Sequence, residues 1–295
     1  MTDGSLAEDL AISAVHKPVL VPDPAAPPAG AADRRGARPW SPVRLRANRR
    51  FVVIVSLLVT FGIWEMIGRD SNPVLFAPVS RVAEDGWEIG RTGEFWSAAW
   101  STAYGILLGF TIAAVAGVTI GLLSGRYRAI DWATSAQITY LYVTPHIVFI
   151  PLFMLWFGLG FTVKLAIVIM GAIFPILITT HDGAKITSEE AVDVARVEGA
   201  SELQILSKIV LPGTLPYIMT GMRLGIGKAM TGMIAAELFT QLSGLGGLIL
   251  IYTSSFRSAS MLFVIFMIGV FGWGLTAMMG LAERRFARWK FPDAA

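Results

Sequence analysis

The chain has 295 residues, of which 54% are hydrophobic and only 15% are charged, and its mean hydropathy is +0.62. A soluble domain of this length would carry roughly a quarter charged residues, so the composition excludes that class and indicates an integral membrane protein. The chain has no cysteine, which excludes a disulfide framework and a Cys-ligated metal. The net charge of +3 does not indicate nucleic-acid binding, because much of the basic charge clusters near the ends of expected spans.

The first fifty residues differ from the rest of the chain. Ala, Pro, Gly and Asp dominate between Val21 and Ala37, and no apolar run precedes Phe51. We therefore expect no cleavable signal peptide and predict that residues 1–50 form a largely disordered extension. Four arginines stand directly before the first apolar run, as is typical of a cytoplasmic flank attracted to anionic lipid.

Residues 51–295 are predicted to form one all-α transmembrane domain. A bilayer core requires roughly 20 apolar residues per helix, and six stretches satisfy this length. They are Phe51–Gly68, Trp96–Leu123, Trp132–Phe157, Phe161–His181, Leu215–Phe239 and Met261–Leu281.

The distribution of basic residues predicts the orientation. An even number of spans puts both termini on one side, and the basic clusters at the termini and after the second and fourth spans all fall on that side. The positive-inside rule makes it the cytoplasm. The opposite side then holds Arg69, Arg81, Arg91, Lys164 and Arg257.

A polar segment, residues 182–212, interrupts the apolar runs between the fourth and fifth spans. Thr187 to Glu190 and Ser201 to Gln204 each read as a capping box, which predicts two short helices. Gly199 lies between them, where a chain leaving a helix often needs a positive φ angle. Pro212 is expected to stop the second helix.

Two segments on the predicted outer side are less regular. Asn72 to Gly90 begins with turn residues and continues as a mixed apolar and charged run, which predicts a short helix at the membrane interface. Ser243 to Leu248 is apolar and glycine-rich. It is either a simple turn or a re-entrant loop near a gate.

Glycines recur at four-residue spacing inside the spans, which predicts closely packed helices. This spacing is common in membrane helices and identifies no function by itself. The glycines concerned are Gly105, Gly109, Gly117, Gly121, Gly125, Gly221 and Gly225.

Few charges lie inside the spans, and a charge in a membrane is a functional hypothesis by default. Glu65 and Arg223 lie near span ends, whereas Lys228 is deeper. Lys228 and Glu237 are separated by roughly 13 Å along one helix, too far for a direct pair. Each either lines a translocation path or pairs with another helix, and the sequence leaves both alternatives open.

No catalytic or nucleotide-binding motif is apparent. Gly225 to Lys228 superficially resembles a phosphate loop, but Met222 stands where that loop needs a glycine, and Ala229 replaces the magnesium-ligating hydroxyl residue. The three histidines are too far apart in sequence to suggest a local metal motif. We therefore predict a non-enzymatic chain without a cofactor or metal of its own, so any ATP must be bound by another chain.

The polar segment resembles the EAA loop of permease subunits of binding-protein-dependent ABC importers. Gly199 and the string Ile209-Val210-Leu211-Pro212 match that pattern, and Asp193-Val194-Ala195 stands in for Glu-Ala-Ala. The resemblance extends from about Leu75 to Trp289. Further motifs are similar to the nitrate, sulfonate and taurine branch of this family, and they include Pro145, Pro151, Ala236-Glu237 and Gly244 to Ile249.

The resemblance implies a type I importer fold in a bacterial inner membrane. It also implies a homodimer of the permease, a cytoplasmic ATPase dimer that holds ATP and magnesium, and an external solute-binding protein. The solute class favoured is a small anion such as a sulfonate, taurine, nitrate or an aromatic carboxylate. The residues implied in ATPase coupling are Asp193, Ala195, Arg196, Glu198, Gly199, Ala200, Ser201, Ile209, Leu211 and Pro212, with Glu202 as a further polar contact. The path or gate candidates are Lys228, Glu237, Pro145 and Pro151.

An ion-coupled secondary transporter is the main alternative. Such a protein needs a titratable cluster within the membrane and usually an internal repeat, and the sequence shows neither a paired-acid site nor a convincing repeat. A membrane-embedded enzyme would need a catalytic constellation, which the sequence does not show.

Overall fold

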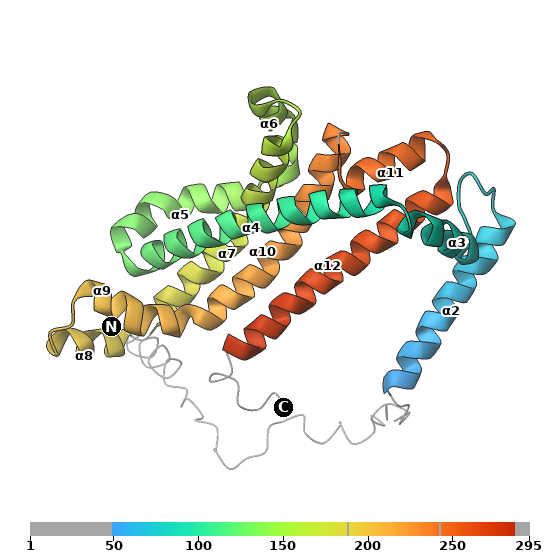
Figure 1. Ribbon diagram of the computed structural model, residues 1–295. Coiled ribbons are helices and arrows are strands. Elements are labelled where there is room, and N and C mark those ends of the chain that lie inside the picture. Colours follow the sequence, from blue (N-terminus) through green and yellow to red (C-terminus); the bar gives the residue numbers. More distant parts are fainter. Residues whose placement is uncertain (1–48, 188, 242, 287–295) are drawn as a thin grey trace, which may run out of the picture. The chain divides into compact units, whose positions relative to one another are not determined.

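A computed structural model describes residues 49–187, 189–241 and 243–286, and every regular element in these ranges is a helix (Figure 1). The chain divides into two compact units, Met1–Val55 and Ser56–Ala295, and the described part of the first unit is the start of α2. The all-α prediction is confirmed. The long helices are α2 (Arg49–Asp70), α4 (Gly93–Arg126), α7 (Phe161–Ile186), α10 (Leu211–Thr240) and α12 (Ser258–Phe286). The shorter ones are α3 (Val79–Gly90), α5 (Arg128–Val143), the 3-10 helix η1 (His146–Phe149), α6 (Ile150–Phe157), α8 (Glu189–Val197), α9 (Glu202–Ile205), the π-helix η2 (Leu206–Val210) and α11 (Leu245–Ser254).

Four continuous helices in the described residues are long and apolar enough to cross a membrane, and two bent helix pairs bring the number to as many as six. The third predicted span is one of these pairs. Instead of a single helix over Trp132–Phe157, α5 meets the η1 and α6 segment at 89°. Pro145 explains the break, because it cannot donate a backbone hydrogen bond and it forces Thr144 into an extended conformation, with ψ 125°.

The predicted stop at Pro212 is wrong. Pro212 is the second residue of α10, and the helical path continues into it from α9 through η2. A proline ring clashes with the carbonyl four residues earlier in an α-helix, and the wider π turn directly before Pro212 relieves that clash. The fifth span therefore lies within α10, and α11 follows it at 44°.

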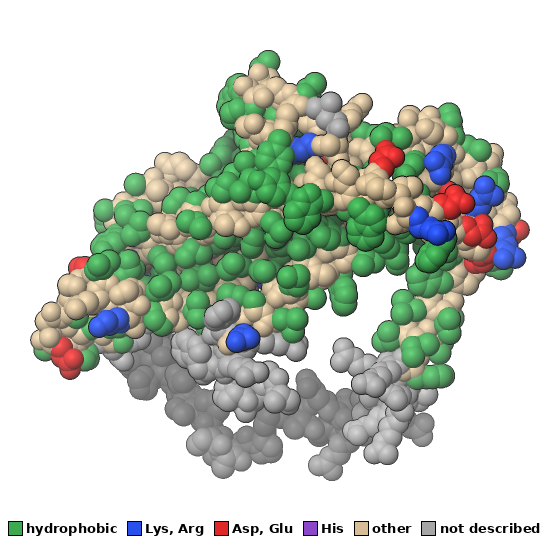
Figure 2. All heavy atoms as spheres, in the orientation of Figure 1, with side chains coloured by type: hydrophobic (Ala, Val, Ile, Leu, Met, Phe, Trp, Pro, Cys, Tyr) green, Lys and Arg blue, Asp and Glu red, His purple; other side chains and the backbone are tan. Residues whose placement is uncertain are grey.

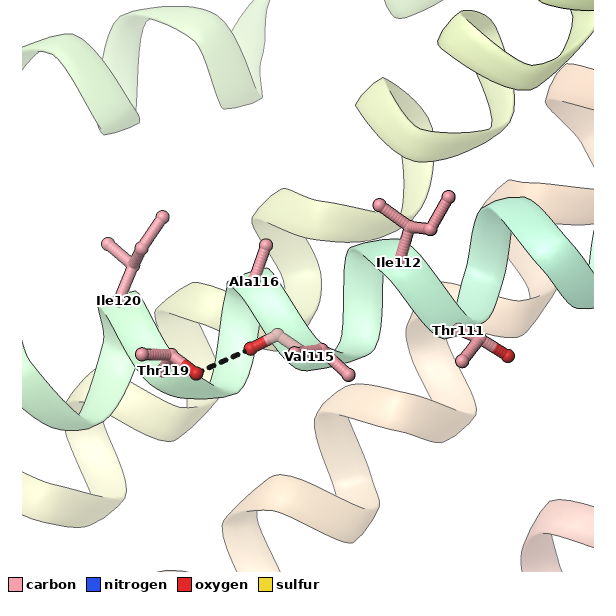
Figure 3. Close-up of a pocket in the computed structure, with 6 residues that line it drawn as sticks. All are labelled: Thr111, Ile112, Val115, Ala116, Thr119 and Ile120. Carbon is pink, nitrogen blue, oxygen red and sulfur yellow. Dashed lines mark hydrogen bonds between the residues drawn. The ribbon is translucent and has the colours of Figure 1, made fainter.

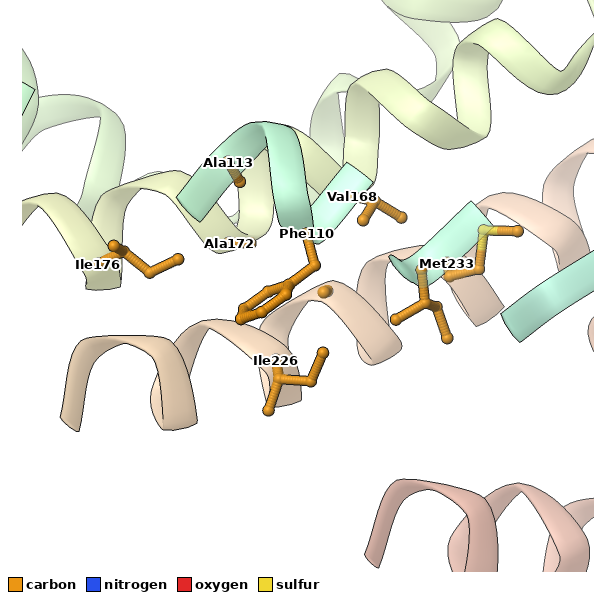
Figure 4. Close-up of a cluster of buried hydrophobic side chains, with 9 residues drawn as sticks. Phe110, Ala113, Val168, Ala172, Ile176, Ile226 and Met233 are labelled. Carbon is orange, nitrogen blue, oxygen red and sulfur yellow. The ribbon is translucent and has the colours of Figure 1, made fainter. Parts of the chain in front are cut away.

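The largest hydrophobic core cluster joins α4, α7 and α10 (Figure 4). Each of the three helices contributes small and large side chains that interdigitate. The members are Ile106, Phe110, Ala113, Val168, Ala172, Ile176, Ile226, Ala229 and Met233. This three-helix core positions the elements discussed below.

The glycines at four-residue spacing lie where α4, α7 and α10 approach one another closely, as predicted. A methyl group added at Gly109 would lie 2.5 Å from Val168, and one at Gly121 would lie 2.7 Å from the carbonyl oxygen of Leu177, both in α7. On α10, a methyl at Gly225 would lie 2.9 Å from Ile176. Close backbone approach is what lets these helices associate in lipid.

The short helix predicted after Asn72 is confirmed as α3, with Val82 and Ile89 buried. Figure 2 shows hydrophobic side chains over most of the visible face of the long helices, while charged side chains gather around α3. Large apolar side chains such as Trp100 (70% exposed) and Leu155 (80% exposed) lie on the surface of the chain. A bilayer can cover such a face, since lipid tails are as apolar as these side chains.

Candidate coupling segment and membrane-buried charges

The polar segment folds into α8 and α9, as the two capping signals predict. At the second signal, the Ser201 hydroxyl accepts a hydrogen bond from Gln204 N, and the Gln204 side chain accepts one from Ser201 N at 2.9 Å. The first signal includes Ser188, which lies outside the described residues. The second capping box is therefore confirmed, and it fixes where α9 begins.

Gly199 ends α8 in a Schellman motif. Its φ is +83°, Gly199 N donates to Arg196 O at 3.0 Å, and Ala200 N donates to Ala195 O at 2.9 Å. These bonds satisfy carbonyls that a helix end leaves free, and the left-handed conformation explains why glycine is needed. No atom lies within 4 Å of a methyl group placed on Gly199, so the requirement comes from the backbone and not from packing.

Replacing Gly199 by valine should therefore strain the turn by about 1–2 kcal/mol and misplace α9 relative to α8. We expect reduced ATP-dependent uptake with a normal amount of permease in the membrane. Gly199→Asn is the matched control, because asparagine tolerates the left-handed region and should keep most of the uptake. Equal uptake by the two variants, measured at equal expression, would contradict this explanation.

A small hydrophobic cluster holds the segment on the ends of α4 and α7. Leu122 of α4 and Ala184 of α7 pack with Val192, Ile205 and Val210 of the segment. Three of the predicted coupling residues, Ala195, Ala200 and Ile209, pack against this cluster. They therefore connect the segment to the membrane helices.

Ion pairs reinforce this attachment. Glu202 accepts hydrogen bonds from Arg126 Nη2 of α4 at 2.9 Å and from Arg196 Nη2 at 3.0 Å, and Arg196 Nη1 lies 3.7 Å from Asp193. Glu202 precedes the fifth predicted span, Leu215–Phe239, in the sequence. The hydrogen bond from Arg196 lowers the pKa of the Glu202 carboxyl below its usual range. Arg196 and Glu202 thus bind each other within the segment, while the Asp193 side chain remains 72% exposed.

Apolar side chains face outward on the same segment. Val194 and Val197 of α8 are 60% and 89% exposed, and Leu203 of α9 is 75% exposed. The sequence analysis missed these residues because it considered polar contacts. The available signal was the pair of valines at i and i+3 in an otherwise polar helix, which places both on one face. Among the other predicted coupling residues, Glu198, Ser201, Leu211 and Pro212 are exposed.

Glu237 is fully buried and caps α11. Thr102 Oγ1 of α4 donates to the Glu237 carboxylate at 2.8 Å, and Gly246 N donates to it at 2.9 Å. The same Thr102 oxygen accepts a hydrogen bond from Leu245 N at 2.9 Å. Because a helix N-terminus carries free N–H groups and a positive dipole, the carboxylate is stabilised there. This arrangement joins α4, α10 and α11.

Gly244 explains the glycine-rich turn before α11. Its φ is +89°, and a methyl group at this position would overlap the Glu237 carboxylate. The segment from Ser243 therefore turns tightly over Glu237 and leads directly into a helix. The turn and the acid of the Ala236-Glu237 motif are one structural unit.

Lys164 belongs to the same unit, although the sequence analysis placed it on an outer flank. Its side chain is 2% exposed, and Nζ donates to the Ser243 hydroxyl at 2.7 Å and to the Ser243 carbonyl at 3.0 Å. Lys164 and Glu237 also attract each other electrostatically. Helical spacing in the sequence could have predicted this burial. Lys164 lies on the same helix face as the buried residues Ile167, Val168 and Gly171, which follow it at i+3, i+4 and i+7.

The remaining path candidates lie apart from this buried unit. Lys228 is exposed on α10, Pro145 precedes η1 at the bend of the third span, and Pro151 lies in the first turn of α6. A hollow on α4 is lined by apolar groups and two threonines whose hydroxyls bond to their own helix (Figure 3). Its lining residues, Thr111, Ile112, Val115, Ala116, Thr119 and Ile120, offer no free polar group to a ligand.

Comparison with known proteins identifies relatives over most of the chain. Residues 117–288 match the family described as binding-protein-dependent transport system inner membrane component. The putative aliphatic sulfonates transport permease of Bacillus subtilis (strain 168) is 32% identical over 79% of this chain and 85% of its own length. The nitrate import permease of Leptolyngbya laminosa is 26% identical over 81% of this chain and 88% of its own length. The taurine transport system permease of Escherichia coli (strain K12) is 27% identical over 65% and 73%, respectively.

Proposed function

Because the chain belongs to the family of binding-protein-dependent transport system inner membrane components, we propose that it carries a small anion through the membrane as the permease of an ABC importer. In this proposal two copies of the chain form the passage, and a cytoplasmic ATPase dimer binds ATP and magnesium. An external binding protein delivers the solute. The named relatives transport aliphatic sulfonates, nitrate and taurine, which supports an anionic solute.

The outward face of the polar segment, residues 182–212, supports a partner ATPase, and we call this segment the coupling segment below. It presents Val194, Val197 and Leu203 outward, while the cluster around Ile205 and the Arg126 to Glu202 ion pair hold its other side to α4. An exposed apolar patch with a polar rim is typical of a protein interaction site. ATP-driven movement of a docked ATPase would be transmitted through this attachment to α4 and α7.

Cysteine labelling tests the proposed orientation. The chain has no cysteine, so a single cysteine at Val197 or Leu75 is a unique target. We expect a membrane-impermeant maleimide to label Leu75→Cys in intact cells that express the permease without its ATPase, and to label Val197→Cys in such cells only after permeabilisation. The reverse pattern would put the coupling segment outside the cell and overturn the proposal.

Energy coupling separates the proposal from the alternative of a secondary transporter. Uptake by a purified complex of permease, ATPase and binding protein should require ATP and all three components. Uptake driven by a pH gradient through the permease alone would instead support the secondary transporter.

A further inference from the structure

Lys228 lies near the centre of its membrane span. It is 13 residues from Leu215 and 11 residues from Phe239, which corresponds to about 20 Å and 16 Å along the helix. A lysine stem cannot carry its ammonium group over that distance to the membrane surface. The ammonium must therefore find water or an anion at this depth.

The other charges inside the predicted spans have partners, which sets Lys228 apart. Glu65 binds Arg69 at 2.7 Å, Arg223 lies 3.5 Å from Glu283, and Glu237 is held by Thr102 and Gly246. Within the described part of the chain, Lys228 is exposed and has neither a hydrogen-bond partner nor an ion-pair partner. A cation of this kind is expected to face an aqueous passage and not lipid.

A second feature at the same level also indicates water. The helix break at Thr144 and Pro145 leaves non-helical backbone within the third span, and such backbone is tolerated at membrane depth only inside protein or beside a water-filled cavity. The break lies beside Lys228. A methyl group placed on Gly171 of α7 would lie 3.0 Å from His146 Nε2 and 3.2 Å from the Lys228 carbonyl oxygen. His146 and the Lys228 side chain also interact electrostatically.

The exposed stripe of α10 around Lys228 is open and carries small side chains beside the apolar Leu224, which is 54% exposed. Gly227 and Thr231 are exposed next to Lys228, and the Thr231 hydroxyl bonds to the Gly227 carbonyl oxygen at 3.0 Å. No atom lies within 4 Å of a methyl group placed on Gly227, so the surface there is open. Glu237 does not belong to this exposed stripe, because its side chain is fully buried.

We propose that Lys228 is the anion-selecting residue of the solute passage, where its ammonium group balances the charge of a sulfonate, carboxylate or nitrate beside the Pro145 break. The inference rests on the proposed function in naming the solute as an anion. It assigns part of the selectivity to the permease itself, in addition to any selection by a binding protein. It also separates the two charged path candidates, because only Lys228 can contact a passing solute.

Charge-selective labelling tests the inference on the full-length chain in membranes. Thr231→Cys, one turn from Lys228, is treated with an anionic sulfonatoethyl and a cationic trimethylammonioethyl methanethiosulfonate. We expect both reagents to react, and the ratio of anionic to cationic rates to fall about tenfold when Lys228→Met is added. Lys228→Arg should keep the ratio. Gly227→Cys offers a second open position if Thr231→Cys folds poorly.

Val59→Cys, a 53% exposed position in the middle of α2, is the lipid-facing control and should not react. Reactivity at Thr231→Cys no greater than this control, or a ratio unchanged by Lys228→Met, would overturn the inference. ATP-dependent uptake of nitrate or taurine is measured in parallel. Uptake that survives Lys228→Met unchanged would leave the importer function standing and remove the role of Lys228. Charge-selective labelling without ATP-dependent uptake would support the aqueous site and count against the importer.

Discussion

Replacing Glu237 by lysine should prevent the chain from forming a stable helix bundle. The carboxylate is fully buried and accepts hydrogen bonds from Thr102 and from Gly246 N, and Lys164 is buried nearby. A second ammonium would leave the Gly246 N–H without an acceptor and would repel Lys164. Leaving a buried charge without compensating groups in this way costs about 3–5 kcal/mol. That cost is a large fraction of the total stability of a typical protein, which is about 5–15 kcal/mol.

Size-exclusion profiles and melting temperatures of the detergent-solubilised permease measure this effect. Glu237→Gln should be milder, because an amide oxygen can still accept one of the hydrogen bonds. Lys228→Glu reverses a charge at an exposed position of the same helix and should melt close to the wild type. A monodisperse Glu237→Lys protein that melts at the wild-type temperature but has lost uptake would contradict this prediction and would indicate that Glu237 lines the solute passage.

Replacing Val197 by aspartate should detach the ATPase while the permease stays folded. Val197 is 89% exposed, so the substitution removes almost no contact within the chain. Burying a valine side chain at an interface contributes about 1.5–3 kcal/mol, and losing it corresponds to roughly ten- to hundredfold weaker association. The aspartate adds the cost of desolvating a charge, so this is the largest effect that we expect from an exposed position.

Copurification of the ATPase with tagged permease measures the association, and ATP-dependent uptake measures its consequence. Leu75→Asp is the matched control, because Leu75 is 76% exposed but lies between α2 and α3, on the predicted outer side. It should retain the ATPase. If Val197→Asp retained the ATPase at the wild-type ratio, the outward face of α8 would not be the docking surface.

Local rules accounted for the elements that depend on short stretches of chain. Apolar runs of span length predicted the continuous membrane helices, the Ser201 to Gln204 spacing predicted the start of α9, and Gly199 has the positive φ angle expected of it. Each depends on hydrophobicity, capping or backbone sterics within a few residues, so no distant part of the chain is needed. The Pro212 prediction used the same rules and failed, because a π turn just before the proline accommodates its ring.

The sequence by itself therefore determined the membrane class, the all-α fold and the place of the polar segment, residues 182–212. Only the tertiary structure decided which charged groups have partners. Lys164 and Glu237 are 73 residues apart in the chain, yet both bind the turn around Ser243 to Gly246, whereas Lys228 is left exposed beside the bend at Pro145. The physical reason is that the free energy of a charge in a membrane depends on the groups that the fold brings to it, and spacing along one helix cannot reveal partners on other helices.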